Sequence, residues 1–278
     1  MNISNIFEYT FINHAILAAL LSSIICGILG TYIVTKRMVF ISGGITHASF
    51  GGIGIAFYLG LSPFIGAAIF AVLAALGVKW FSKKGDIRND SSIGIFWSLG
   101  MAIGIIFIYI TPGFTPNLMS YLFGSIITVS SMELYIMALL TFVIVLVFSL
   151  FLRPILYFSF DENFAKSQNA PVDIINYTII VLIALGIVIN IKVAGIILIM
   201  SMLTLPQNTA NLFSDNFKLI IIYSIIISLV GTLIGLAGSF WLGIPSGASI
   251  IFTLALIFFI AKILRSLINK KKIKILTK

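Results

Sequence analysis

The chain has 278 residues, of which 60% are hydrophobic and only 9% charged, and its mean hydropathy is +1.18. Soluble domains carry about 25% charged residues, so this composition excludes a water-soluble protein and indicates a polytopic membrane protein. A net charge of +9 suits basic cytoplasmic loops and gives no reason to expect nucleic-acid binding.

Nine segments are apolar enough to be membrane-spanning helices, which need roughly 20 mostly apolar residues. In chain order they are 11–35, 38–60, 64–81, 93–110, 132–152, 174–190, 193–213, 219–241 and 248–264. The first segment and the region 112–131 are the least regular, so eight spans is the alternative. We therefore predict one all-α transmembrane domain over residues 1–278, a helical bundle of 8–9 spans.

The second span contains a run of small residues at helical spacing. Residues four apart share a helix face, and small residues let two membrane helices approach closely. This pattern predicts a packing surface on the second span. Its members are Gly44, Ala48, Gly52, Ala56 and Gly60.

His47 lies one position away from this stripe, between Gly43 and Gly51 on its own face. The glycines predict that neighbouring side chains leave open the space around the imidazole. Ionisable groups within a membrane usually face a cavity or a partner. His47 is therefore either a metal ligand or proton-handling group in an ion path, or a neutral histidine that bonds to a neighbouring helix.

Proline and glycine interrupt the chain after the fourth span, at Pro112, Gly113 and Pro116. The following stretch, Asn117 to Ile127, is apolar but too short to cross a membrane. It predicts either a short outer or re-entrant helix, or a loop packed on the bundle.

The segment from Arg153 to Asp173 predicts a short helix outside the membrane. Asp161 suits its N-cap, Glu162 suits its first turn, and Asn169 with the following Pro171 suits its end. The segment also carries aromatic side chains that are unusual on a bare loop, so a partner protein or the membrane surface should cover them. These are Phe158, Phe160 and Phe164.

The seventh span combines polar side chains with Pro206. Proline lacks an N–H, so the carbonyl of Met202 should lose its helical partner. A broken helix with free carbonyls, together with the amide of Asn208, could serve an ion path. The alternative is a simple kink with a polar end.

Basic residues predict the orientation of the chain. If the C-terminal tail is cytoplasmic and nine spans alternate, every Lys and Arg except Lys192 falls on the cytoplasmic side. The tail, residues 265–278, is the most basic segment.

Five motifs stand in a characteristic order along residues 11 to 264. They are Arg37-Met38 before the His47 helix, Asn117 to Gly124, Phe160-Asp161 followed by Ala165, Val193-Ala194-Gly195 leading to Pro206, and Ile244 to Ala248. In this order the chain resembles the membrane permease of bacterial ATP-binding-cassette importers for zinc, manganese and iron.

The resemblance implies a homodimer in the plasma membrane, with cytoplasmic ATP-binding subunits and an extracytoplasmic metal-binding protein as partners and lipid around it. It implies that the short helix with Asp161, Glu162, Phe164, Ala165 and Asn169 is the coupling helix for the ATPase. A divalent metal ion is then the cargo, and no permanently bound cofactor is expected. The chain itself has no phosphate-binding loop, so another subunit must hydrolyse ATP.

Two positions depart from the family pattern. Gly43 stands where the family usually has an aspartate on the face of the histidine, and Asn169 stands where glycine is usual. A lone histidine binds a divalent ion poorly. Alternatives are therefore a permease for a metal chelate or other cargo, or a self-contained ion-coupled transporter. The latter would need acidic residues in the spans, and the candidates, Glu133 and Asp173, lie near span ends.

Overall fold

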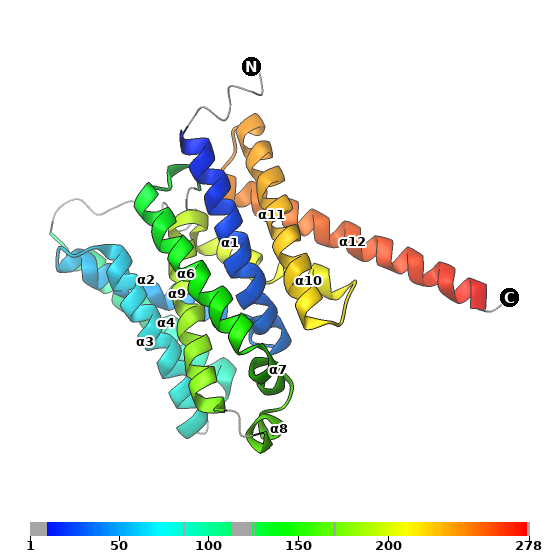
Figure 1. Ribbon diagram of the computed structural model, residues 1–278. Helices are drawn as coiled ribbons and strands as arrows, with labels where there is room; N and C mark the ends of the chain where they lie inside the picture. Colours follow the sequence, from blue (N-terminus) through cyan, green and yellow to red (C-terminus); the bar gives the residue numbers. More distant parts are fainter. Residues whose placement is uncertain (1–9, 86, 113–123, 125, 169–170, 277–278) are drawn as a thin grey trace.

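The computed structural model describes residues 10–85, 87–112, 124, 126–168 and 171–276, and their secondary structure is helical (Figure 1). In chain order the helices are α1 (Thr10–Thr35), α2 (Val39–Tyr58), α3 (Pro63–Lys84), α4 (Asn89–Ile110), the short 3₁₀ turn η2 (Ile126–Thr128), α6 (Ser131–Leu150), α7 (Leu152–Phe160), α8 (Glu162–Ser167), α9 (Val172–Met202), α10 (Leu205–Asn211), α11 (Phe217–Leu242) and α12 (Ser246–Leu276).

Nine stretches of the described residues are long and apolar enough to cross a membrane. Seven are the single helices α1, α2, α3, α4, α6, α11 and α12. The other two are Val172–Ile191, within α9, and Val193–Asn211, which combines the end of α9 with α10. The predicted all-α bundle is confirmed, with the larger of the two predicted counts.

The spans form an inner and an outer set. The buried share is 72% for α1, 78% for α2 and 72% for Val172–Ile191, but only 22–33% for α3, α4, α6, α11 and α12. In a membrane, the outer set presents its apolar side chains to lipid. Figure 1 shows α2, α3 and α4 on one side of the bundle and α10, α11 and α12 on the other, with α1, α6 and α9 between them. Helix α9 contacts both sides.

Helix α9 is kinked at Gly195, whose φ of +79° favours glycine over residues with a Cβ. A side chain at Gly124 would overlap the backbone of Gly195, so the two glycines permit a close approach there. Residues Ile191 and Lys192, which lie between two predicted spans, do not form a loop, because the helix continues through them to the kink. A second break at Leu203-Thr204 separates α9 from α10.

Two predicted features fall partly outside the described residues. Of the proposed helix from Asn117 to Ile127, only Gly124 and the first two residues of η2, Ile126 and Ile127, are described. The basic tail does not begin as a separate segment, because α12 continues from its membrane span through Leu276.

Candidate functional site

His47 lies on α2 and stacks on Trp97 of α4. Their ring centroids are 4.3 Å apart and the rings are nearly parallel, at 7°. The imidazole remains partly exposed, whereas its α2 neighbours Thr46 and Ala48 are completely buried. In a single copy of the chain, His47 therefore lies at the edge of the packed interior.

The glycines beside His47 do not leave empty space, and that part of the prediction was wrong. A Cβ at Gly43 would lie 2.8 Å from Cε and 3.2 Å from Sδ of Met200, and 3.5 Å from the ring of Trp97. A Cβ at Gly51 would lie 2.9 Å from the Phe70 ring and 2.9 Å from the Gly100 carbonyl oxygen. The glycines instead make room for side chains and backbone of α3, α4 and α9.

Trp97 and Met200 are thus the neighbours of the His47 face that sequence patterns missed. Trp97 belongs to α4 and Met200 to α9, so no spacing within α2 could have indicated either. Both are neutral, and the thioether of Met200 takes up space where a side chain at position 43 would otherwise project. An approaching cation would meet an imidazole, an indole face and a sulfur atom here.

The small-residue stripe packs closely along most of its predicted length. A side chain at Gly44 would overlap Ile93 of α4, and one at Gly52 would overlap the Gly66 carbonyl of α3. Ala48 and Ala56 are buried between these helices.

The stripe does not extend to Gly60, and the prediction is corrected there. Helix α2 ends at Tyr58, and Gly60 adopts a φ of +67° in the turn that follows. A Cβ at Gly60 would have no neighbour within 4 Å, so this glycine serves the turn rather than helix packing.

The break near Pro206 is present, but the Met202 carbonyl that it releases is not free. The Nε2 of Gln207 donates to the Met202 carbonyl at 3.2 Å and to the Cys26 carbonyl at 2.7 Å. Pro206 is buried at the start of α10. Met202 therefore has a side-chain partner in place of the lost helical one, contrary to the prediction.

Asn208 also differs from its predicted setting. It is exposed, and its amide donates to the Thr204 carbonyl at 2.8 Å. The segment before the break is the one that approaches the His47 face, through Met200. The structure thus brings Gly43 against Met200 of α9 and His47 against Trp97 of α4, and places Pro206 and Asn208 on α10.

The segment predicted to dock a partner forms two short helices, α7 and α8, at one end of the bundle (Figure 1). Asp161 caps α8 as expected, and its Oδ1 accepts from the N–H groups of Asn163 at 2.8 Å and Phe164 at 3.1 Å. Glu162 pairs with Lys166 at 2.8 Å, and this contact holds the pKa of Glu162 below its usual range. Asn169 lies outside the described residues.

The aromatic residues of this segment do not share one environment. Phe158 is 2% exposed, and its carbonyl accepts from Lys36 at 2.5 Å while its ring lies under the same ammonium at 3.8 Å. Phe158 therefore needs no partner protein to cover it, contrary to the prediction. Phe160 and Phe164 remain 73% and 47% exposed, whereas Ala165 is fully buried.

The acidic residues that an ion-coupled transporter could have used serve other roles. Glu133 forms a capping box with Ser130 at the start of α6. Asp173 pairs with Lys83 at 2.6 Å. Among the described residues, no three His, Cys, Asp or Glu side chains are grouped closely enough to hold a metal ion.

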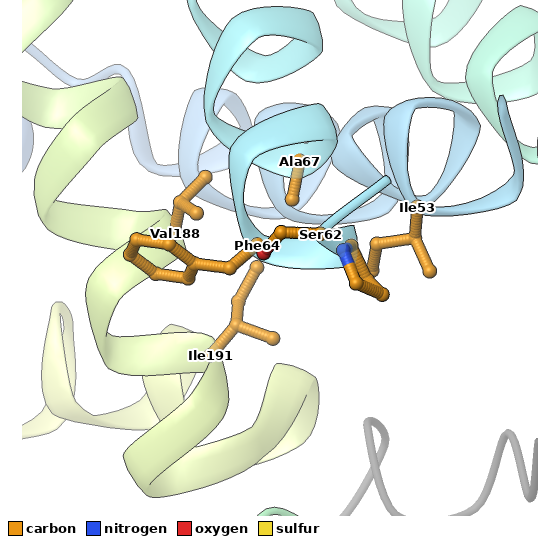
Figure 2. A pocket seen from close by; sticks show the side chains of 7 residues that line it. Ile53, Ser62, Phe64, Ala67, Val188 and Ile191 are labelled. Atoms are coloured by element: carbon orange, nitrogen blue, oxygen red, sulfur yellow. The ribbon is translucent and has the colours of Figure 1, made fainter. Parts of the chain in front are cut away.

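A small cavity of about 90 Å³ lies between α2, the start of α3 and α9 (Figure 2). Figure 2 shows Phe64 extending from α3 toward Val188 and Ile191 of α9. The described residues around this cavity include one hydroxyl, on Ser62, and no charged side chain. It is an apolar packing cavity between helices and does not offer the ligands that an ion site needs.

These features define a polytopic membrane protein, with an intramembrane histidine and a short two-helix segment at one end of the bundle. Comparison with known proteins makes the assignment specific: residues 8–265 match the model of the ABC 3 transport family. The chain belongs to that family, and it is a permease subunit rather than an enzyme.

Individual relatives match nearly the whole chain. The membrane protein slr2045 of Synechocystis sp. is 39% identical over 254 residues, covering 91% of this chain and 90% of the relative. The manganese transport system membrane protein MntC of Halalkalibacterium halodurans is 32% identical and covers 91% and 87%. The structure of PsaBC from Streptococcus pneumoniae in complex with Fab has a TM-score of 0.82, with 32% identity and 93% of each chain covered.

Proposed function

We propose that this chain is the permease of an importer that carries a divalent metal ion into the cytoplasm, with manganese as the first cargo to test. The observation that carries the proposal is His47, an intramembrane ligand type in a chain that is 32% identical to a manganese transport protein. Family membership argues against the self-contained ion-coupled transporter, and so do the engaged carboxylates of Glu133 and Asp173.

The cargo would pass a site of mostly neutral groups. Without a carboxylate at position 43, His47 would bind a hydrated cation weakly, with water, backbone carbonyls or a second copy of the chain completing its shell. Weak binding suits a permease, because conduction requires that an ion leave its site as readily as it enters.

A second copy of the chain would enclose this path. His47 is partly exposed, and Ile197, on the α9 segment that includes Met200, is 46% exposed. An imidazole facing lipid is costly, so this surface is best explained by contact with another protein surface. The family resemblance points to a homodimer.

ATP-binding subunits would dock at α7 and α8. Phe160 and Phe164 supply exposed aromatic surface there, and the Asp161 cap gives α8 a defined start. An extracytoplasmic metal-binding protein would deliver cargo at the opposite end of the bundle. The plasma membrane is the expected location, with the C-terminus and the α7–α8 end cytoplasmic.

Uptake of radiolabelled Mn²⁺ by cells that lack other manganese importers tests the proposal, with the chain co-expressed with its ATPase and binding protein. Losing an interaction with a charged group costs about 1.5–3 kcal/mol, so His47→Ala should lower uptake about 10- to 100-fold. His14→Gln is the matched control, because His14 instead contacts the Val129 carbonyl through Nδ1 at 3.0 Å.

Normal uptake by His47→Ala at normal expression would contradict the proposal and leave His47 as a packing partner of Trp97. Uptake of a metal chelate but not of the free ion, by the unmodified chain, would show that the cargo is wrong while the permease role stands. Competition by Zn²⁺ and Fe²⁺ in the same assay ranks the metals.

A further inference from the structure

A polar cavity of about 210 Å³ lies at the α7–α8 end of the bundle, away from His47. Helices α1, α2, α3, α4, α7, α8 and α9 contribute to its wall. The polar side chains that line it are Tyr32, Lys36, Lys79, Asn89, Glu162 and Asn176. A second cavity of about 310 Å³ adjoins it, and the two share five lining residues: Lys36, Met38, Ile41, Val78 and Asn89.

Two of the lining residues are deeply buried, and their polar groups have no hydrogen-bond partner among the residues that the structure describes. Tyr32 is 1% exposed and Asn176 is 5% exposed. Within the described part of the chain, neither the Tyr32 hydroxyl nor the Asn176 amide makes a hydrogen bond. Buried polar groups are nearly always hydrogen-bonded, so these two donors are available to a molecule in the cavity.

The charges around the cavity favour an anion. Lys36 is held by Phe158, whereas Lys79 is half-buried and forms no hydrogen bond or ion pair with any described residue. Glu162 is neutralised by Lys166 at 2.8 Å. The cavity is therefore lined by two ammonium groups, those of Lys36 and Lys79, and by one carboxylate, that of Glu162, which is already paired. This excess of positive charge repels a cationic cargo.

The adjoining cavity adds further positive charge near lipid. Arg37 and Arg88 line it, together with Asp90, which lies 3.7 Å from Arg88. Phe40, on the same wall, is 66% exposed at the start of α2. The two cavities together thus extend from the buried donors Tyr32 and Asn176 to the exposed Phe40 at the end of a membrane span.

We propose that these cavities bind the phosphate of an anionic phospholipid headgroup, with Tyr32, Lys79 and Asn176 as its donors. A phosphate oxygen accepts strongly from ammonium, hydroxyl and amide groups, and basic pockets between membrane helices bind such headgroups. Exposed Phe40 favours a lipid over free phosphate, because an acyl chain can lie against it. The bound headgroup would bridge α1, α3 and α9 beside α7 and α8.

Native mass spectrometry of the full-length permease in detergent tests this site. Phosphatidylglycerol and phosphatidylcholine with identical acyl chains are the two probes. We expect the unmodified chain to retain phosphatidylglycerol preferentially. Tyr32→Phe and Lys79→Met should each lower the retained fraction about tenfold, since each removes one hydrogen bond to a charged group. Tyr32→Phe removes a single oxygen atom and therefore serves as the variant least able to disturb folding.

Lys218→Met is the matched control, because Lys218 is an exposed basic residue at the start of α11, outside both cavities. Equal loss of lipid in this control would reduce the effect to general charge attraction and overturn the proposal. Equal retention of the two lipids by the unmodified chain would also overturn the lipid proposal. In that case free phosphate remains the alternative ligand.

Thermal unfolding separates the two sources of phosphate. A ligand that binds only the folded state raises the melting temperature in proportion to its free-energy contribution. The melting temperature in phosphate is compared with that in chloride at equal ionic strength. If phosphate raises it for the unmodified chain but not for Lys79→Met, the site binds phosphate, and its ligand is the free ion rather than a lipid. No lipid preference and no stabilisation by phosphate would rule the site out.

Discussion

At the scale of single residues, the surroundings of His47 determine what the imidazole can bind. It stacks on Trp97, and Met200 occupies the space beside Gly43 on the same face. The ring nitrogens are the only ionisable groups in this trio, so the site has no fixed negative charge to retain a cation. That arrangement favours brief contact with a cargo ion over storage.

Gly43→Asp should convert this weak site into a stronger one. The new Cβ would lie 2.8 Å from Met200 Cε, the end of a flexible side chain that can move, so the change is compatible with folding. The carboxylate would stand one helical turn from His47, and we expect Mn²⁺ affinity to rise about tenfold or more. Isothermal titration of the purified permease measures the affinity.

The matched control is Gly43→Ala, which brings the same Cβ without a charge and should leave the affinity unchanged. A similar affinity in Gly43→Asp and Gly43→Ala would mean that the His47 face does not meet the metal. Slower uptake together with tighter binding in Gly43→Asp would show that release limits transport.

At the scale of elements, α2 is held by backbone contacts that only glycine permits. Gly52 approaches the Gly66 carbonyl of α3, and Gly54 approaches the backbone of Gly104 in α4. Because these contacts involve backbone rather than flexible side chains, a methyl group at either position requires the helices to separate. The packing of α2 against α3 and α4 therefore sets the position of His47.

Gly52→Ala should destabilise the folded permease by about 3 kcal/mol, the upper end of the usual cost of overpacking, because the backbone atoms that it meets cannot relax easily. Gly94→Ala is the control, because a Cβ there meets nothing within 4 Å and alanine improves helix propensity by about 1 kcal/mol. Melting temperatures in detergent distinguish them. Similar melting temperatures for the two variants would contradict the close packing of α2.

The α7–α8 element allows a test of partner docking. Phe164→Asp places a charge on the proposed docking surface, and we expect it to release the ATP-binding subunit while the permease still inserts. Co-purification measures this. Phe213→Asp is the control, because Phe213 is 48% exposed, close to the 47% of Phe164, but lies in the turn between α10 and α11. Retention of the ATPase by Phe164→Asp would place the coupling contact elsewhere.

At the scale of the whole molecule, basic residues from separate helices meet at the end of the bundle that carries α7 and α8. Lys36 contacts Phe158 of α7, and Lys83 pairs with Asp173 at the start of α9. These contacts place the ends of α1 and α3 on the same side as α7 and α8. Positive residues concentrate in cytoplasmic loops, which is the basis for the orientation proposed above.

Reporter fusions test that orientation. A fusion after Lys278 and one between Lys83 and Arg88 should report a cytoplasmic position, and one near Pro245, between α11 and α12, an external position. The physical reason is that translocating a cluster of Lys and Arg across the membrane is unfavourable. An external signal from the Lys278 fusion would reverse the proposed topology.

Features that depend on neighbours along the chain could be predicted from the sequence. The nine spans follow from the length of each apolar segment, and the Asp161 cap follows from the side chain that precedes its helix. The small residues of α2 likewise identified a face that packs closely, with Gly60 as the exception because the helix ends before it.

Features that depend on contacts between distant segments were decided only by tertiary structure. Met200 and Trp97 fill the space beside His47, Gln207 satisfies the Met202 carbonyl, and Lys36 covers Phe158. Each pair joins residues from different helices or across a helix break, and their proximity depends on how the helices pack. Apolar length and local hydrogen bonding thus determine the spans and the cap, whereas packing determines which side chains enter the spaces that the glycines leave.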